Sequence, residues 1–153
     1  MPRPRPGLVS RPRLLTRLDE SASKKLLIIS AAAGFGKTTL VSEWLHRQDS
    51  PAAWLSLDPG DNDRARFLAY FIAAIQTVYP EIGEESAALL RASQQASVES
   101  LLTPLILALD ALPEPFIIVL DDYHLIENEE IHNSVTFLLD FLPEQIQLIL
   151  VAR

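Results

Sequence analysis

The amino-acid sequence predicts an α/β protein in which helices cover both faces of a parallel β-sheet. Three observations predict this fold class. Short apolar runs alternate with longer segments of helical periodicity along the 153 residues, which is the pattern of a parallel sheet. One strand-like run leads directly into a glycine-containing turn at residues 31–39 and then into a helix. Another, at residues 116–120, ends in two consecutive aspartates, Asp121 and Asp122.

The composition is that of one globular domain. Apolar residues make up 48% of the chain, enough for a buried core, and the absence of Cys excludes disulfides and thiolate metal sites. The net charge is −7, and the only basic residue from Ala92 onward is Arg153, so the surface is expected to repel nucleic acid. No apolar run approaches the ~20 residues of a membrane span, and residues 1–7 lack the apolar core of a signal peptide. We therefore expect a cytoplasmic protein without a membrane partner.

The N-terminal part of the chain is expected to divide into a leader and the start of the domain. Residues 1–10 are rich in Pro and Arg and predict a flexible leader, whereas residues 11–153 predict a single domain. The basic leader can contact a phosphate or stay solvated, and we favour the solvated state. A helix over residues 11–21 is predicted by three apolar residues on one face: Leu14, Leu15 and Leu18.

Residues 31–39 have the pattern of a phosphate-binding loop. They follow an apolar run at residues 25–30, which predicts a buried strand, and they lead into a helix that we expect to end near Gln48. Glycines let the backbone N–H groups of the loop turn inward, and the helix N-terminus adds free N–H groups and a partial positive charge. The sequence matches the pattern G-x-x-x-x-G-K-[ST] except at its first glycine, which is Ala31 here.

The loop residues have expected roles in binding ATP or ADP with Mg²⁺. Lys37 is expected to reach the β- and γ-phosphates, and the Thr38 hydroxyl is expected to bind Mg²⁺. The residues expected to bind the nucleotide are Ala33, Gly34, Phe35, Gly36, Lys37, Thr38 and Thr39.

One strand and three helices are predicted between the helix that follows the loop and the strand that ends in the two aspartates. Apolar periodicity places the strand at residues 52–57 and the helices at residues 63–80, 84–95 and 97–112. Pro104 leaves the start of the last helix open. Either Thr103 caps a helix that begins at Pro104, or the helix begins earlier and contains the proline.

Asp121 and Asp122 end the most apolar strand of the chain. A buried strand that carries carboxylates to its C-terminal end is the Walker B pattern, and ligands bind at that edge of open α/β sheets. We expect Asp121 to hold Mg²⁺ through water and Asp122 to polarise the water that attacks the nucleotide. A helix capped by Asn128 and a fourth strand at residues 147–152 are predicted to follow.

Two further residues are predicted to lie near this edge. Arg153 follows the fourth strand, where it either senses the γ-phosphate as a charged donor or has no role; the sequence leaves both open. His124 lies just beyond the aspartates, and we expect it to be a turn residue near the site rather than a catalytic group.

Several of these motifs together resemble one known family. The matching segments are residues 11–14, 33–40, 53–58 and 119–126. They are similar to the large ATP-binding transcriptional regulators of the LuxR type, the group that includes the activator of the maltose regulon. These proteins belong to the signal-transduction ATPases with numerous domains (STAND). The resemblance covers almost the whole chain.

The resemblance implies a P-loop NTPase fold of the ASCE/STAND type, with strand order 5-1-4-3-2, that stops here after its fourth strand. It implies a nucleotide switch with slow hydrolysis, since an Asp-Asp pair offers a shorter base than the Glu of fast ATPases. It also implies that a full-length protein contacts DNA and RNA polymerase through further C-terminal domains. This segment alone is not expected to bind nucleic acid.

Two other functions remain open from the sequence. A P-loop kinase-like phosphotransferase needs an Arg-rich lid, and only Arg64, Arg66 and Arg91 lie between the two motifs. An inactive interaction module that retained the fold is the third possibility. Copurifying nucleotide distinguishes the inactive module from the switch, and a screen for phosphoryl acceptors identifies a kinase.

Overall fold

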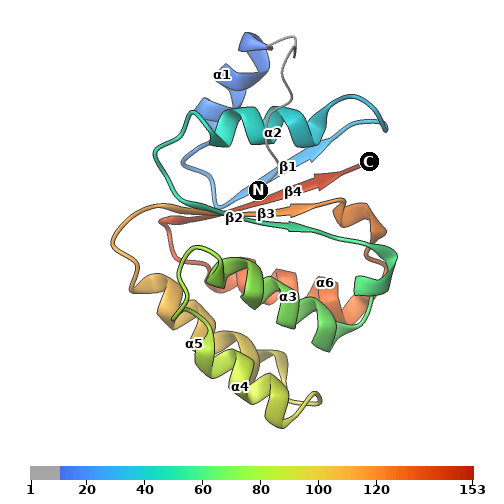
Figure 1. Cartoon of the computed structure of the whole chain (residues 1–153), viewed down its shortest axis with the longest axis vertical. Helices are drawn as coiled ribbons and strands as arrows, with labels where there is room; N and C mark the ends of the chain where they lie inside the picture. Colours follow the sequence, from blue (N-terminus) through green and yellow to red (C-terminus); the bar gives the residue numbers. More distant parts are fainter. Residues whose placement is uncertain (1–10) are drawn as a thin grey trace.

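The computed structural model describes residues 11–153, so the leader predicted at residues 1–10 lies outside the described part of the chain. A β-sheet lies between two helical layers, with α1 and α2 on one face and α3 to α6 on the other (Figure 1). The sheet contains β1 (Leu26–Ser30), β2 (Ala52–Ser56), β3 (Phe116–Asp121) and β4 (Ile146–Ala152). All three strand pairs are parallel, in the order β1-β4-β3-β2. This arrangement confirms the predicted α/β class.

The two central strands contribute alternate side chains to two separate cores. On β3, Ile117 and Val119 face the layer of α1 and α2, whereas Phe116, Ile118 and Leu120 face the other helices. The same alternation holds along β4. Successive side chains of a strand point to opposite faces, so a strand covered on both faces must be apolar throughout. This requirement explains the uninterrupted apolar run that ends at the aspartates.

The upper helical layer consists of α1 (Pro12–Glu20) and α2 (Lys37–Leu45). Asp19 of α1 joins them, because its Oδ1 accepts hydrogen bonds from Trp44 Nε1 at 2.8 Å and from Gln48 Nε2 at 3.0 Å. Trp44 is fully buried between α1 and the sheet. The N-terminal helix is therefore fixed to the helix that follows the glycine-containing loop.

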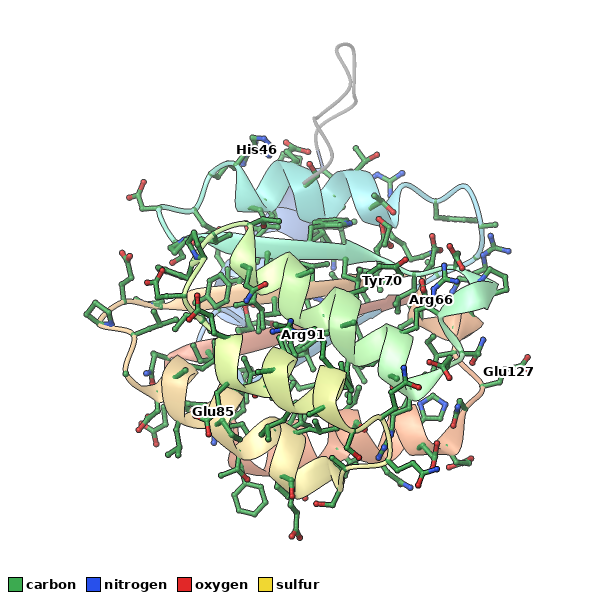
Figure 2. All side chains as sticks on the ribbon, turned by 60° about the horizontal axis from the view of Figure 1, so that its bottom comes forward. His46, Arg66, Tyr70, Glu85, Arg91 and Glu127 are labelled. Atoms are coloured by element: carbon green, nitrogen blue, oxygen red, sulfur yellow. The ribbon has the colours of Figure 1, made fainter. Side chains whose placement is uncertain are left out.

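The lower layer contains α3 (Arg64–Gln76), α4 (Glu84–Ala92), α5 (Val98–Asp110) and α6 (Glu129–Phe141). Side-chain oxygens of Asp63, Ser97 and Asn128 cap three of these helices by accepting backbone N–H groups of their first turns. On the exposed face of α3, the Arg66 guanidinium lies 5.3 Å from the ring centre of Tyr70 (Figure 2). No helix within residues 11–153 has the length and apolarity needed to cross a membrane.

The structure corrects three helix ends and decides the start of α5. The helices predicted to reach residues 48, 80 and 95 end at Leu45, Gln76 and Ala92, and turns follow each. The helix containing Pro104 takes the earlier start, with Ser97 as its cap. Leu101 and Leu102 precede the proline and are buried in the core, so their burial offsets the hydrogen bond that Pro104 cannot donate.

Candidate functional site

The sequence motifs meet at the carboxyl edge of the sheet. Ser30, which ends β1, is aligned with Ala152 at the end of β4, and the Ala31 N–H donates to the Ala152 carbonyl at 3.5 Å. β3 lies on the other side of β4 and ends in Asp121. The parallel arrangement therefore brings together the loop after β1, the aspartates after β3 and the residue after β4.

Two glycines give the loop its conformation. Gly34 and Gly36 have φ values of 82° and 71°, a region that L side chains rarely adopt. A Cβ at either position would meet no atom within 4 Å, so the backbone angle alone calls for glycine, and space is open around the loop. Gly36 is also the N-cap of α2, whose first N–H groups have no side-chain cap. Free N–H groups at a helix N-terminus form a site suited to an anion.

Lys37 lies across this loop. Its Nζ donates to the carbonyl oxygens of Ala31 at 2.6 Å and Ala32 at 3.1 Å. The tip of the loop is bound from outside as well, since Arg11 Nη1 donates to the Phe35 carbonyl at 2.9 Å. A cation held by two neutral carbonyls is a ready partner for an anion, because charge-assisted hydrogen bonds are the stronger ones.

One hydrogen bond joins the two motifs across 83 residues of sequence. Thr38 Oγ1 donates to Asp121 Oδ2 at 2.9 Å, and the Asp122 N–H donates to Asp121 Oδ1 at 3.0 Å. Burial raises the pKa of Asp121, the nearby Asp122 carboxylate raises it further, and the bond from Thr38 acts in the opposite direction. A hydroxyl and a carboxylate that are adjacent and partly buried fit Mg²⁺, which takes oxygen ligands.

The described part of the chain offers this cation few other ligands. Within residues 11–153, no group of three or more His, Cys, Asp and Glu side chains could hold a metal ion. Mg²⁺ commonly binds through one or two protein groups and completes its shell with water and substrate phosphates. Thr38 and Asp121 fit that pattern.

The remaining predicted residues differ in how close they come to this pair. Asp122 is half-buried beside Asp121, and it is the one residue other than glycine with a positive φ, 58°, in the described part of the chain. Ala33 and Phe35 lie exposed on the loop, and Thr39 lies in the first turn of α2. Arg153 is exposed at the end of β4 and makes no hydrogen bond or ion pair to residues 11–152.

Two contacts near the site are absent from the sequence analysis. The first is the bond from Arg11 to the loop, for which the basic character of the N-terminal segment was the one available signal. The second is Asn62, whose amide donates to the Leu125 carbonyl at 2.8 Å and accepts from the N–H groups of Glu127 and Asn128. Nothing in the sequence indicates a contact between residue 62 and residues 125–128.

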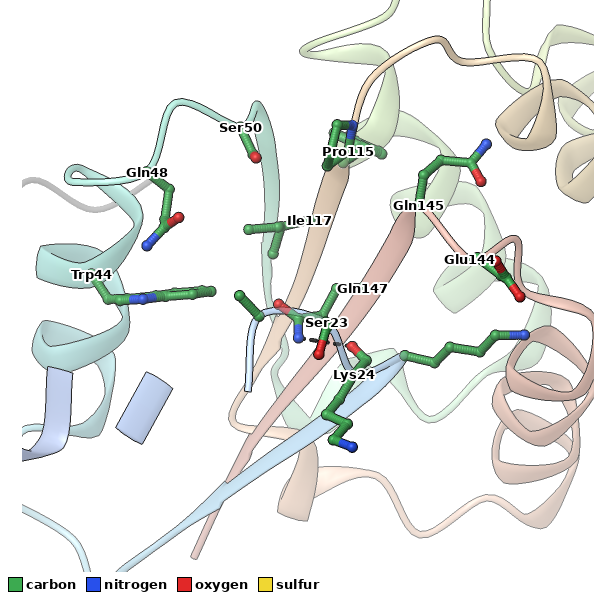
Figure 3. A pocket seen from close by; sticks show the side chains of 13 residues that line it. Ser23, Lys24, Trp44, Gln48, Ser50, Pro115, Ile117, Glu144, Gln145 and Gln147 are labelled. Carbon is green, nitrogen blue, oxygen red and sulfur yellow. Dashed lines mark hydrogen bonds between the residues drawn. The ribbon is translucent and has the colours of Figure 1, made fainter. Parts of the chain in front are cut away.

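A separate cavity of about 450 Å³ lies at the amino ends of the strands (Figure 3). Trp44, Gln48 and Gln147 line it together with residues 22–25. Gln147 Nε2 donates to the carbonyls of Ser21 and Lys24 at 2.8 Å each. None of the candidate site residues lines this cavity, so it is distinct from the carboxyl edge.

Comparison with known proteins gives sequence relatives for nearly the whole chain. The family model of the AAA ATPase domain matches residues 11–151. The HTH-type transcriptional regulator MalT of Klebsiella pneumoniae is 40% identical over 145 residues, which are 95% of this chain and 16% of that protein. MalT of Yersinia pestis is 41% identical over 145 residues, which are again 95% of this chain and 16% of that protein. These matches confirm the resemblance seen in the motifs, and the chain spans about one sixth of the length of these relatives.

A solved structure supports the fold independently. A Walker-type ATPase of Pyrococcus abyssi superposes with a TM-score of 0.67 and 16% identity, over 99% of this chain and 47% of that one. At this identity the likeness concerns the fold, and it confirms the predicted P-loop NTPase sheet.

Proposed function

This chain belongs to the AAA ATPase domain family, and we propose that it is the ATP- and ADP-binding module of a bacterial transcriptional regulator, with slow hydrolysis as a nucleotide switch. One observation carries the proposal: the Thr38 hydroxyl contacts the Asp121 carboxylate at 2.9 Å, beside a glycine-containing loop and an uncapped helix N-terminus. The relatives are named as HTH-type transcriptional regulators. We extend the proposal to a cytoplasmic location and to DNA and RNA polymerase as partners of the longer protein.

The proposed binding mode follows from charge and donors. Residues 33–39 surround the phosphates with backbone N–H groups, and Lys37 exchanges its two carbonyl partners for phosphate oxygens. Thr38 and Asp121 hold Mg²⁺, which when bound neutralises charge on the β- and γ-phosphates. This assignment gives Asp121 the compensating charge that its burial calls for.

Hydrolysis requires a group that orients water, and we assign this role to Asp122. The water oxygen bonds to the γ-phosphorus while the bond from that phosphorus to the β–γ bridging oxygen breaks. The proton lost by the water passes through the Asp122 carboxylate to the released phosphate, and ADP leaves. Arg153 is assigned to the γ-phosphate because Ala152, the residue before it, is aligned with the last residue of β1.

Nucleotide affinity of Lys37→Ala tests the binding proposal. Loss of one charge-assisted contact of about 1.5–3 kcal/mol weakens binding by roughly 10- to 100-fold. We expect this loss for ADP and ATP with Mg²⁺ in isothermal titration calorimetry. Lys25→Ala is the matched control, since Lys25 is an exposed lysine at the opposite end of β1, and its affinity should equal that of the unaltered protein.

Two results would count against the binding proposal. Equal ADP affinity in the Lys37→Ala variant and the unaltered protein would show that the loop is not the phosphate site. Absence of nucleotide both in the titration and in mass spectrometry of the purified protein would identify the chain as an inactive module that retained the fold.

A further inference from the structure

His124 lies partly buried next to the proposed hydrolytic carboxylate, with its side chain 19% exposed. It belongs to the short 3-10 helix η2 (Tyr123–Leu125), which follows Asp122 directly. Its Nδ1 lies 3.9 Å from Asp122 Oδ1, beyond hydrogen-bond distance. Within residues 11–153, neither ring nitrogen has a hydrogen-bond partner, and both are buried from solvent. A buried ring nitrogen without a hydrogen-bond partner loses the hydrogen bonds that water would give it, which is unfavourable.

The backbone beside this histidine is strained. Asp122 adopts φ 58° and ψ 34°, the left-handed region, and such conformations concentrate at functional sites because the surrounding structure must hold them. The N–H of Asp122 donates to Asp121 Oδ1 at 3.0 Å. The main chain of the turn is thus fixed. Among residues 11–153, the Asp122 carboxylate has one basic side chain within ion-pair distance, His124.

We propose that His124 is a positioning residue: its Nδ1–H holds the Asp122 carboxylate in the orientation that polarises the attacking water. This inference rests on the proposed hydrolytic function. A gap of 3.9 Å closes to a hydrogen bond with a shift of about 1 Å in a side chain, and catalytic hydrogen bonds commonly shorten only when substrate is present. The second oxygen of Asp122 then remains available for water.

Three variants separate positioning from a structural role. His124→Leu removes the donor and keeps an apolar body. His124→Asn keeps an N–H donor near the place of Nδ1. His132→Leu is the matched control, because His132 is the neighbouring histidine on α6 and its Nδ1 contacts the Tyr123 hydroxyl at 2.8 Å rather than Asp122.

Single-turnover hydrolysis of γ-labelled ATP, with protein in excess, gives the kinetic readout, and titration with ADP gives the affinity. We expect His124→Leu to slow hydrolysis about tenfold, less than the roughly 10²- to 10⁴-fold contribution of a group that itself transfers the proton, with ADP affinity unchanged. His124→Asn should recover most of the rate, and His132→Leu should retain it. In an Asp122→Asn background, His124→Leu should add no further loss, because the histidine acts through that carboxylate.

Several outcomes would overturn the inference. Full activity of His124→Leu is one, and equal loss in the Leu and Asn variants together with weaker ADP binding is another. If the unaltered protein binds nucleotide but does not hydrolyse it, both this role and the hydrolytic step fail while the binding proposal stands. If nucleotide does not bind at all, the proposed function itself fails.

A second measurement depends on neither turnover nor a stable histidine variant. The chain has three histidines, so its imidazole proton signals are few enough to assign by NMR. Adding Mg²⁺ with a non-hydrolysable ATP analogue should shift the His124 signals in the unaltered protein. The shift should disappear in Asp122→Ala, and its persistence there would contradict the contact.

Discussion

Asp121 is a carboxylate placed where a charge is unfavourable until a cation binds. It ends β3, a strand that is buried along its whole length, and burial is the largest cause of its raised pKa. Thr38 and the Asp122 N–H satisfy its two oxygens, and the nearby Lys37 cation lowers its pKa, but burial outweighs these effects. The free protein therefore carries an electrostatic cost at this residue that Mg²⁺ is expected to relieve.

This cost leads to a prediction about Asp121→Asn. The pKa of Asp121 is raised in the folded protein, so the folded state binds this proton more tightly than the unfolded state does. The resulting contribution to the free energy of unfolding is present at low pH and is lost as pH rises through the pKa of the folded state. We expect the variant to melt at a higher temperature than the unaltered protein at pH 7.5, with the difference disappearing near pH 4. Thermal melts followed by circular dichroism measure it.

The control for this prediction is Asp140→Asn, which alters an exposed aspartate on α6. The melting temperature of this control should equal that of the unaltered protein both at pH 7.5 and near pH 4. Adding Mg²⁺ and ADP should stabilise the unaltered protein more than Asp121→Asn, since ligand binding to the native state shifts unfolding by mass action. A melting temperature of Asp121→Asn below that of the unaltered protein at pH 7.5 would contradict the electrostatic account.

At the residue scale, the sequence predicted those side chains whose positions follow from the spacing of a motif and from the parallel direction of the strands. Lys37 and Thr38 follow a strand that must be parallel to the strand ending at Asp121, so their meeting at one edge required no knowledge of side-chain positions. The partners of Lys37 in the free loop, the bond from Arg11 to Phe35 and the isolation of His124 depend on packing between distant segments. Local sequence carries no signal for such contacts.

At the scale of elements, Asn62 connects two segments that follow neighbouring strands. It lies just beyond the 3-10 helix η1 (Pro59–Asp61), after β2, and its side chain binds the main chain at Leu125, Glu127 and Asn128, after β3. The Asn128 side chain returns a bond to the Asn62 carbonyl at 2.8 Å. These bonds fix the segment that carries Asp122 and His124 relative to α3.

We predict that Asn62→Ala destabilises the fold and disturbs this segment. Loss of several partly buried hydrogen bonds costs about 2 kcal/mol, which lowers the melting temperature by roughly 4–8 °C in a domain of this size. Asn133→Ala, at an exposed position of α6, is the control, and this variant should have nearly the melting temperature of the unaltered protein. Equal melting temperatures for the two variants would show that the connection does not contribute to stability.

The predicted elements agree with the structure wherever apolar periodicity is long. The four strands and the lower helices follow from uninterrupted or regularly spaced apolar residues. Helix ends were wrong by three or four residues, as at Gln48 and Pro80, because frayed turns keep the helical composition. Pro104 shows the same limit in another form: local propensity allowed two starts, and burial of Leu101 and Leu102 decided between them.

At the scale of the whole molecule, β1 lies at an edge of the sheet but has the apolar sequence that is typical of a central strand. In the part of the chain that the structure describes, it pairs with β4 on one side and with no strand on the other. Leu27 and Ile29 pack against the core beneath α1 and α2, but Ile28 points to the opposite face and is 59% exposed. Neither a charge nor a proline within β1 deters pairing with another chain.

We therefore predict that the 153-residue chain self-associates through β1. Light scattering coupled to size exclusion should show an average mass that rises with concentration. Ile28→Lys should reduce this association, because an edge lysine opposes strand addition and the exposed position leaves the core intact. Leu107→Lys is the matched control: Leu107 is 64% exposed on α5, away from the edge. If Leu107→Lys lowers association as much as Ile28→Lys does, general surface apolarity is the cause of the association. If the unaltered chain stays monomeric at high concentration, the edge of β1 is protected from strand pairing.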